Sequence, residues 1–144
     1  MKMRVVVGIG DRNFGAPLQW AIEELYSSGA SLQLVHCIVG RLPTEMPYSN
    51  DEAFLDGRRI LDDAVSYADE WGASADAELR EGYAGELLVE FSKSADLLVI
   101  GRHRRRRLIR PYGQSVVGYC VRHVECPLTI VSDGGVELVN HKSP

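Results

Sequence analysis

The chain contains 144 residues, of which 45% are hydrophobic and 25% are charged, and its formal net charge is −4. A chain of this length and composition can bury a hydrophobic core, so we expect a single domain over residues 1–144. No apolar stretch approaches the roughly 20 residues that span a bilayer, and glycine and aspartate interrupt the first apolar run too early for a secretion signal. The sequence therefore argues against a membrane protein and predicts a cytoplasmic one.

The first half of the chain alternates short apolar runs with helical patterns. Residues 4–9 form a β-branched run without polar alternation, which is typical of a strand buried on both faces of a parallel sheet. Apolar residues then recur at helical spacing from Pro17 to Leu25. Residues 32–39 predict a second strand, and the prolines within residues 40–50 predict a loop.

The second half continues the alternation. Residues 51–71 predict a long amphipathic helix, and residues 75–80 alternate in the manner of a half-exposed strand near a sheet edge. Four more apolar segments follow: a helix at 85–94, a strand at 97–100, a helix at 115–124 and a strand at 128–131. Residues 134–144 are expected to be loose or held by a partner.

Strands separated by helices predict a parallel sheet with helices on both faces. Ligands of such sheets bind beyond the carboxyl ends of the strands, where the strand order reverses. If the first and fourth strands are neighbours there, the loop at residues 8–14 faces the loop at residues 101–114. The sequence thus places a candidate site between these two loops.

The second of these loops is strongly basic. Residues 102–110 contain six arginines and His103, and without these arginines the chain has 10 basic against 20 acidic residues. The run could clamp phosphate, dock an acidic partner, contact nucleic acid, or simply be solvated. Because Tyr112 is the one aromatic residue nearby and the remaining chain is acidic, a nucleic-acid site is disfavoured.

The three cysteines do not indicate a metal site or a disulfide framework. Cys37, Cys120 and Cys126 are an odd number at no metal-ligand spacing, and the first two lie within apolar patterns. We therefore expect reduced thiols in the core of a cytoplasmic protein.

Four stretches resemble the universal stress protein family: VVVGI, LQLVHCIV, EGYAGELLVEFSKSADLLVIG and SVVGYCVRHVECPLTIV. The resemblance covers nearly the whole chain. It implies a three-layer α/β sandwich of the adenine nucleotide alpha hydrolase-like type, with five parallel strands in the order 3-2-1-4-5. It also implies a homodimer that pairs through the last strand, here Leu128 to Ser132, whose apolar edge would otherwise be exposed.

Nucleotide-binding members of the family share a Gly-x2-Gly-x9-Gly-Ser/Thr motif after the fourth strand and an aspartate at the end of the first strand. Gly101 and Ser115 match that motif, whereas Arg104 and Gln114 occupy two of its glycine positions, and Gly10 occupies the aspartate position. Glycines let backbone amides approach phosphates, so these departures predict an altered pocket. The resemblance implies the following candidate nucleotide-binding residues: Ile9, Gly10, Asp11, Cys37, Ile38, Gly101, His103, Arg104, Gly113, Gln114, Ser115, Val116 and Val117.

Several of these residues also have simpler interpretations. Ser115 suits a helix N-cap, and Asp11 lies where turns favour aspartate. His36 is expected to be a hydrogen-bonded core histidine, and His123 ends a helix, where a cation suits the dipole. The sequence contains no nucleophile elbow, no poised carboxylate pair and no metal-ligand spacing, so an enzyme is disfavoured.

The leading hypothesis is a non-catalytic stress-response or regulatory module, homodimeric, with an altered nucleotide pocket. One alternative is an adenine-nucleotide binder that holds ATP, with or without Mg²⁺, through an arginine-rich phosphate loop; slow ATP hydrolysis is left open. A second alternative is an anion or nucleic-acid contact through residues 102–110.

Overall fold

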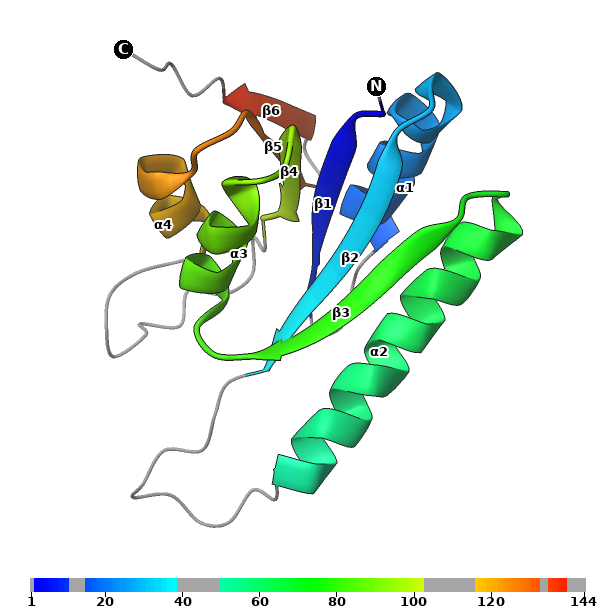
Figure 1. Ribbon diagram of the computed structural model, residues 1–144, viewed down its shortest axis with the longest axis vertical. Helices are drawn as coiled ribbons and strands as arrows, with labels where there is room; N and C mark the ends of the chain where they lie inside the picture. The colour runs from blue at the N-terminus through cyan, green and yellow to red at the C-terminus, as the bar shows by residue number, and fades with distance from the viewer. Residues whose placement is uncertain (1, 11–14, 39–49, 103–115, 133–134, 140–144) are drawn as a thin grey trace.

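The computed structural model describes residues 2–10, 15–38, 50–102, 116–132 and 135–139. Its centre is a six-stranded sheet in the order β3-β2-β1-β4-β5-β6 (Figure 1). The first five strands are parallel, and β6 runs antiparallel to β5. The strands are β1 (Arg4–Ile9), β2 (Ser31–Ile38), β3 (Ala75–Glu81), β4 (Leu97–Gly101), β5 (Leu128–Ser132) and β6 (Gly135–Val139).

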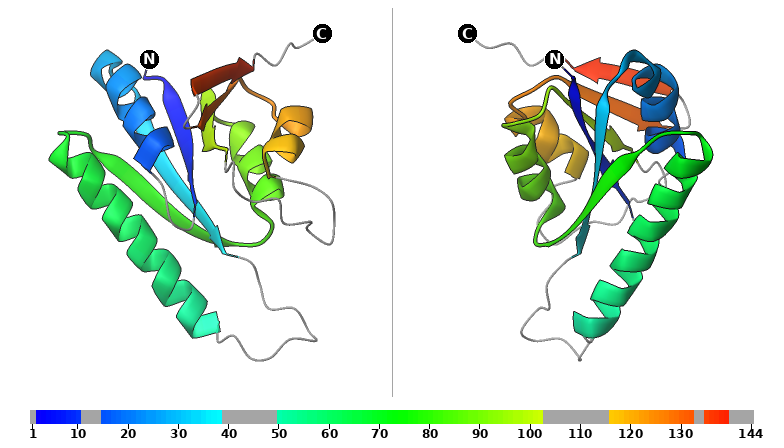
Figure 2. Two further views of the ribbon diagram at one scale, coloured as in Figure 1. Left: turned by 180° about the vertical axis from the view of Figure 1, so that it is seen from behind. Right: turned by 45° about the vertical axis from the view of Figure 1, so that its right-hand side comes forward.

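Helices cover both faces of the sheet. Figure 2 shows α1 and α2 on one face and α3 and α4 on the other, which is the arrangement that right-handed crossovers between parallel strands produce. The helices are α1 (Gly15–Glu24), α2 (Asn50–Glu70), α3 (Ala84–Ser92) and α4 (Val116–His123), with a short 3₁₀ turn η1 (Tyr26–Ser28) after α1. The predicted three-layer α/β architecture and the order of its five parallel strands are confirmed.

Each face has its own hydrophobic core because successive side chains of a strand point to opposite faces. Val5 and Val7 pack under α1 and α2, whereas Val6 packs under α3 and α4. The apolar stripe of α2 contributes Leu61 and Ala64, both fully buried. In the part of the chain that the structure describes, no helix combines the length and the apolar character needed to cross a membrane.

The strand β3 forms one edge of the sheet, as its alternation predicts. On the face of the sheet that carries α3, Arg80 donates a hydrogen bond to Glu78, and Gln33 of β2 donates another to Glu78 at 3.0 Å. Arg80 also lies over the ring of Phe91, 5.3 Å from its centroid. A polar edge of this kind discourages pairing with another chain.

The strand β6 forms the other edge and corrects two expectations. Residues Gly135–Val139 are not loose, because they pair with β5 from Ser132↔Gly135 to Leu128↔Val139. For the same reason the outer edge of β5 is not exposed. The new edge carries Val136 and Leu138, whose side chains are 45% and 70% exposed.

Candidate functional site

The strand register brings the carboxyl ends of β1, β2 and β4 to one edge of the sheet. Ile9 pairs with His36 of β2, and Val7 pairs with Val99 of β4. The strand order therefore reverses between β1 and β4, as predicted, and this reversal is where ligands of parallel sheets bind.

At the end of β1, the side chain of Ile9 is buried and Gly10 is half-buried. The carbonyl oxygen of Ile9 lies 2.8 Å from Nδ1 of His36, whose side chain is only 3% exposed. The expectation of a hydrogen-bonded core histidine is confirmed for His36. His123 is exposed and stacks on Tyr119 at 4.4 Å between ring centroids.

At the end of β2, Cys37 packs against the core under α3 and α4, and Ile38 is buried. The amide of Gly82, after β3, donates to the carbonyl of Ile38 at 2.9 Å and ties the two strand ends together. Burial raises the pKa of the Cys37 thiol to about 11, although the positive charge of Arg80 opposes the shift. Cys37 is therefore a protonated thiol at neutral pH and a poor nucleophile.

The other cysteines are also free thiols in the core. Burial raises the pKa of Cys120 to about 12 and that of Cys126 to about 11. The prediction of reduced core thiols agrees with these environments. Among the residues with described positions, no group of three or more His, Cys, Asp and Glu side chains could hold a metal ion.

At the end of β4, Gly101 has a role in packing that does not depend on a ligand. Its φ is not among the positive values of the described glycines, so it is not required by a left-handed turn. A Cβ atom there would lie only 2.9 Å from Cγ of Pro17. Gly101 thus lets the amino end of α1 approach the strand, which is a role that motif matching did not identify.

The next residue, Arg102, is held in two ways. Its backbone N–H donates to the carbonyl of Val131 at 3.0 Å, and its guanidinium forms an ion pair with Glu137 of β6 at 3.1 Å. Glu137 is not among the predicted site residues, because the carboxyl-terminal residues were expected to be loose or held by a partner. The first arginine of the basic run therefore already has an intramolecular partner.

The amino end of α4 supplies the last described part of the site. Val117 is buried and Val116 is half-buried, and both pack in the core under α3 and α4. Their side chains therefore hold the helix in place, and the backbone groups of its first turn are the parts available to a ligand. The remaining predicted residues, Asp11, His103, Arg104, Gly113, Gln114 and Ser115, lie outside the described residues.

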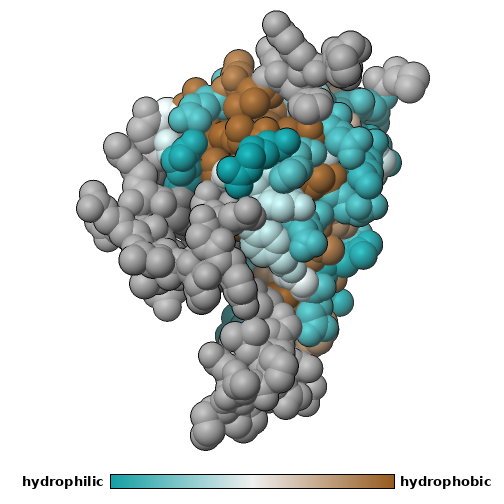
Figure 3. Space-filling view, turned by 90° about the vertical axis from the view of Figure 1, so that its left-hand side faces the viewer, coloured by the Kyte–Doolittle hydropathy of each residue, from teal (hydrophilic) through white to brown (hydrophobic). Residues whose placement is uncertain are grey.

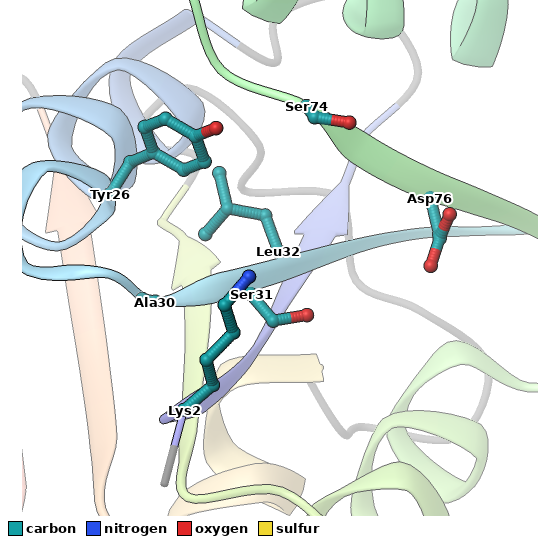
Figure 4. A pocket seen from close by; sticks show the side chains of 7 residues that line it. All are labelled: Lys2, Tyr26, Ala30, Ser31, Leu32, Ser74 and Asp76. Atoms are coloured by element: carbon teal, nitrogen blue, oxygen red, sulfur yellow. The ribbon is translucent and has the colours of Figure 1, made fainter.

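A surface hollow of about 160 Å³ lies at the opposite, amino end of the strands (Figure 4). Leu32 lies beneath it, and Figure 4 shows Lys2 beside Ser31, with Asp76 apart from them. Its position does not match the reversal of strand order, and its polar lining is largely exposed. We therefore assign the candidate site to the carboxyl edge, where strand ends and a helix amino terminus meet.

Comparison with known proteins decides the family. The model of the universal stress protein family matches residues 1–132. The chain belongs to the universal stress protein family. A universal stress protein of Methanocaldococcus jannaschii is 32% identical over 78 residues, which are 53% of this chain and 46% of that protein. This family member spans about half the length of the curated relatives it matches.

Solved structures of universal stress proteins share the fold. One, a complex with cAMP, has 25% sequence identity and a TM-score of 0.69, and the match covers 90% of this chain and 96% of that one. Another, from Archaeoglobus fulgidus in complex with dAMP, has 21% identity and a TM-score of 0.70 over 90% of this chain and 97% of that one. The second likeness establishes the common fold alone.

Proposed function

We propose that this universal stress protein is a non-catalytic regulatory module that holds an adenine nucleotide at the carboxyl edge of its sheet. The observation that carries the proposal is the convergence of Ile9, Ile38 and Gly101 at the strand reversal, beside the amino end of α4. The strand ends present backbone groups at this edge, and the helix end offers N–H groups and a favourable dipole to a phosphate.

The relatives support the class of ligand. The universal stress protein at 25% identity was solved with cAMP, and a protein of the same fold was solved with dAMP. Both ligands are adenine nucleotides that carry one phosphate. A nucleotide with a single phosphate also makes the smallest demand on the altered phosphate loop.

The phosphate end of the site is where this chain departs from the family motif. Arg104 and Gln114 replace glycines whose backbone amides would approach a phosphate. Guanidinium groups can replace amides as phosphate donors, because they form charge-assisted and bidentate hydrogen bonds. We therefore infer that the affinity of this site depends on arginine side chains and falls with added salt.

The direct test is to ask which nucleotide the protein carries and binds. Freshly purified protein is denatured and the supernatant is analysed for released adenine nucleotide; the emptied protein is then titrated calorimetrically with AMP, cAMP and ATP, with and without Mg²⁺. We expect binding of at least one of them, weakened in Arg104→Ala and unchanged in Arg59→Ala, an exposed arginine of α2 that pairs with Asp56. Neither released nor titrated nucleotide at millimolar concentration would refute the proposal.

The absence of turnover is a separate part of the proposal. The described residues at the ends of β1, β2 and β4 include no carboxylate, and the Cys37 thiol is protonated at neutral pH because its pKa is raised to about 11. Neither a carboxylate nor an ionised thiol is therefore available as a general base among the residues described at these strand ends. Phosphate release from ATP over several hours should not exceed that of a buffer blank, and a rate abolished by Arg104→Ala would contradict this part.

We also infer that the protein pairs with a second copy along the β5–β6 side of the sheet. Because β6 occupies the outer edge of β5 (Leu128–Ser132), the strand available for pairing is β6, with Val136 and Leu138 exposed on it. Figure 3, which views the side of α3 and α4, also shows apolar surface gathered at one end of that face. Light scattering should give a dimer that Leu138→Lys dissociates and Leu55→Lys, on α2, does not. A monomeric wild-type protein at micromolar concentration would refute this inference.

A further inference from the structure

His36 lies inside the core directly behind the candidate site. Its side chain is 3% exposed, and its Nδ1 atom lies 2.8 Å from the carbonyl oxygen of Ile9. A carbonyl oxygen only accepts hydrogen bonds, so Nδ1 must carry a proton and donate it. The buried ring therefore donates a hydrogen bond to the carbonyl of Ile9, the last residue of β1.

That carbonyl controls the start of the loop that leaves the sheet. The carbonyl of Ile9 and the N–H of Gly10 belong to one planar peptide unit, so fixing the direction of one fixes the direction of the other. Ile9 is also the last residue of β1 in register with β2, where it faces His36. Beyond this point the β1–β2 ladder no longer holds the chain. The histidine thus sets the direction of the Gly10 N–H at the edge where we place the nucleotide.

A glycine in α2 makes room for this arrangement. A Cβ atom at Gly57 would lie 3.2 Å from Cδ2 of His36, 3.1 Å from Cγ2 of Ile38 and 2.8 Å from Cδ1 of Leu79. Glycine inside a helix is unfavourable relative to alanine. Its presence in α2 is explained by the close approach of the helix to Leu79 first, and then to Ile38 and the ring of His36. The hydrogen bond to Ile9 and the tight packing beside Gly57 both restrict the position of the histidine ring.

We propose that His36 is a positioning residue of the nucleotide site, which holds the Ile9–Gly10 peptide in the orientation that a bound adenine nucleotide contacts. The inference rests on the proposed nucleotide binding for its effect on affinity. Its effect on the peptide itself does not depend on any ligand. The histidine touches no nucleotide and acts through the backbone of β1.

Two variants separate the hydrogen bond from the packing. His36→Asn places an amide N–H donor close to the position of Nδ1, whereas His36→Leu fills the space without a donor. We expect His36→Leu to weaken the binding of AMP or cAMP about tenfold, which corresponds to about 1.4 kcal/mol, and His36→Asn to retain affinity within about threefold of the wild type. Ser92→Ala, at the end of α3, is the control for lost buried hydrogen bonds, because Ser92 accepts from Glu125 and donates to Val89 away from the site.

A ligand-free measurement distinguishes failure of this inference from failure of the proposed function. In ¹H–¹⁵N spectra of the empty protein, His36→Leu should shift the Gly10 amide and speed its hydrogen exchange, His36→Asn should largely restore both, and Ser92→Ala should change neither. If the wild type binds no nucleotide, the proposed function fails and the Gly10 amide alone decides whether His36 holds this peptide. If the Gly10 amide is the same in all variants, or if both His36 variants bind nucleotide equally well, the positioning role is wrong.

Discussion

Gly101→Ala should destabilise the protein even when no nucleotide is bound. The added Cβ atom would lie 2.9 Å from Cγ of Pro17, which is closer than nonbonded carbon atoms approach at their optimal separation. Pro17 is buried at the amino end of α1 and has a rigid ring. The methyl group can therefore be accommodated only by moving α1 away from β4.

The expected magnitude follows from the cost of overpacking a core. One extra methyl group in a packed interior costs about 1–3 kcal/mol, and the lower entropy of alanine in the unfolded chain offsets about 0.4–1 kcal/mol of this. We therefore expect the free energy of unfolding to fall by about 1–2 kcal/mol, measured by urea denaturation of nucleotide-free protein.

Two further variants make the test specific. In Gly8→Ala, the nearest atoms to the new Cβ are side-chain atoms of Ile100 and Leu88 at 3.3 Å, so the loss should be smaller. In the double variant with Pro17→Ala, the clash is removed and the two single losses should not add. If Gly101→Ala unfolds like the wild type, or if Pro17→Ala does not reduce its effect, Gly101 is not a packing glycine and our interpretation is wrong.

Three other predictions concern the thiols, the β6 ion pair and a buried serine. The pKa of Cys37 rises from 9.0 to about 11 on folding, so the thiol ionises first in the unfolded chain. The stability that this thiol contributes is therefore present below pH 9 and lost between about pH 9 and 11. Urea denaturation midpoints should fall less steeply over this pH range in Cys37→Ala than in the wild type. Glu137→Gln breaks an ion pair with Arg102 that is largely exposed, so it should cost under about 1 kcal/mol at low salt and nothing measurable in 1 M NaCl. Ser92→Ala removes the 3.0 Å acceptor of the backbone N–H of Glu125, a part-buried hydrogen bond, and should cost about 0.5–1.5 kcal/mol in thermal unfolding, with nucleotide affinity unchanged.

The architecture was predictable because each element carries its own local signal. Apolar residues without polar alternation in β1 indicate burial on both faces, and the helical spacing of Leu61, Ala64 and Ala68 marks the buried side of α2. The alternation around Leu79 correctly predicts an edge strand. Strands separated by helices then leave few possible topologies.

Parts of the site that depend on distant residues were not predictable. Val136 and Leu138 belong to a segment too short to signal a strand, and it becomes β6 only because the outer edge of β5 offers it hydrogen bonds. The ion pair between Arg102 and Glu137 follows from that pairing. Without the β5–β6 pairing, the outer edge of β5 was expected to be exposed.

The amino-acid sequence by itself determined which segments become strands and helices, the parallel sheet they form and the family to which the chain belongs, because hydrophobic periodicity and motifs are local properties. Only the tertiary structure decided that Gly101 packs against Pro17, that His36 donates a hydrogen bond to the Ile9 carbonyl and that β6 pairs with the outer edge of β5. The contacts of Gly101 and His36 join residues far apart in the chain, and the β5–β6 pairing depends on where the sheet leaves β5 an open edge. Local sequence patterns predict which side chains are buried, whereas the packing of helices against the sheet determines which atoms are in contact.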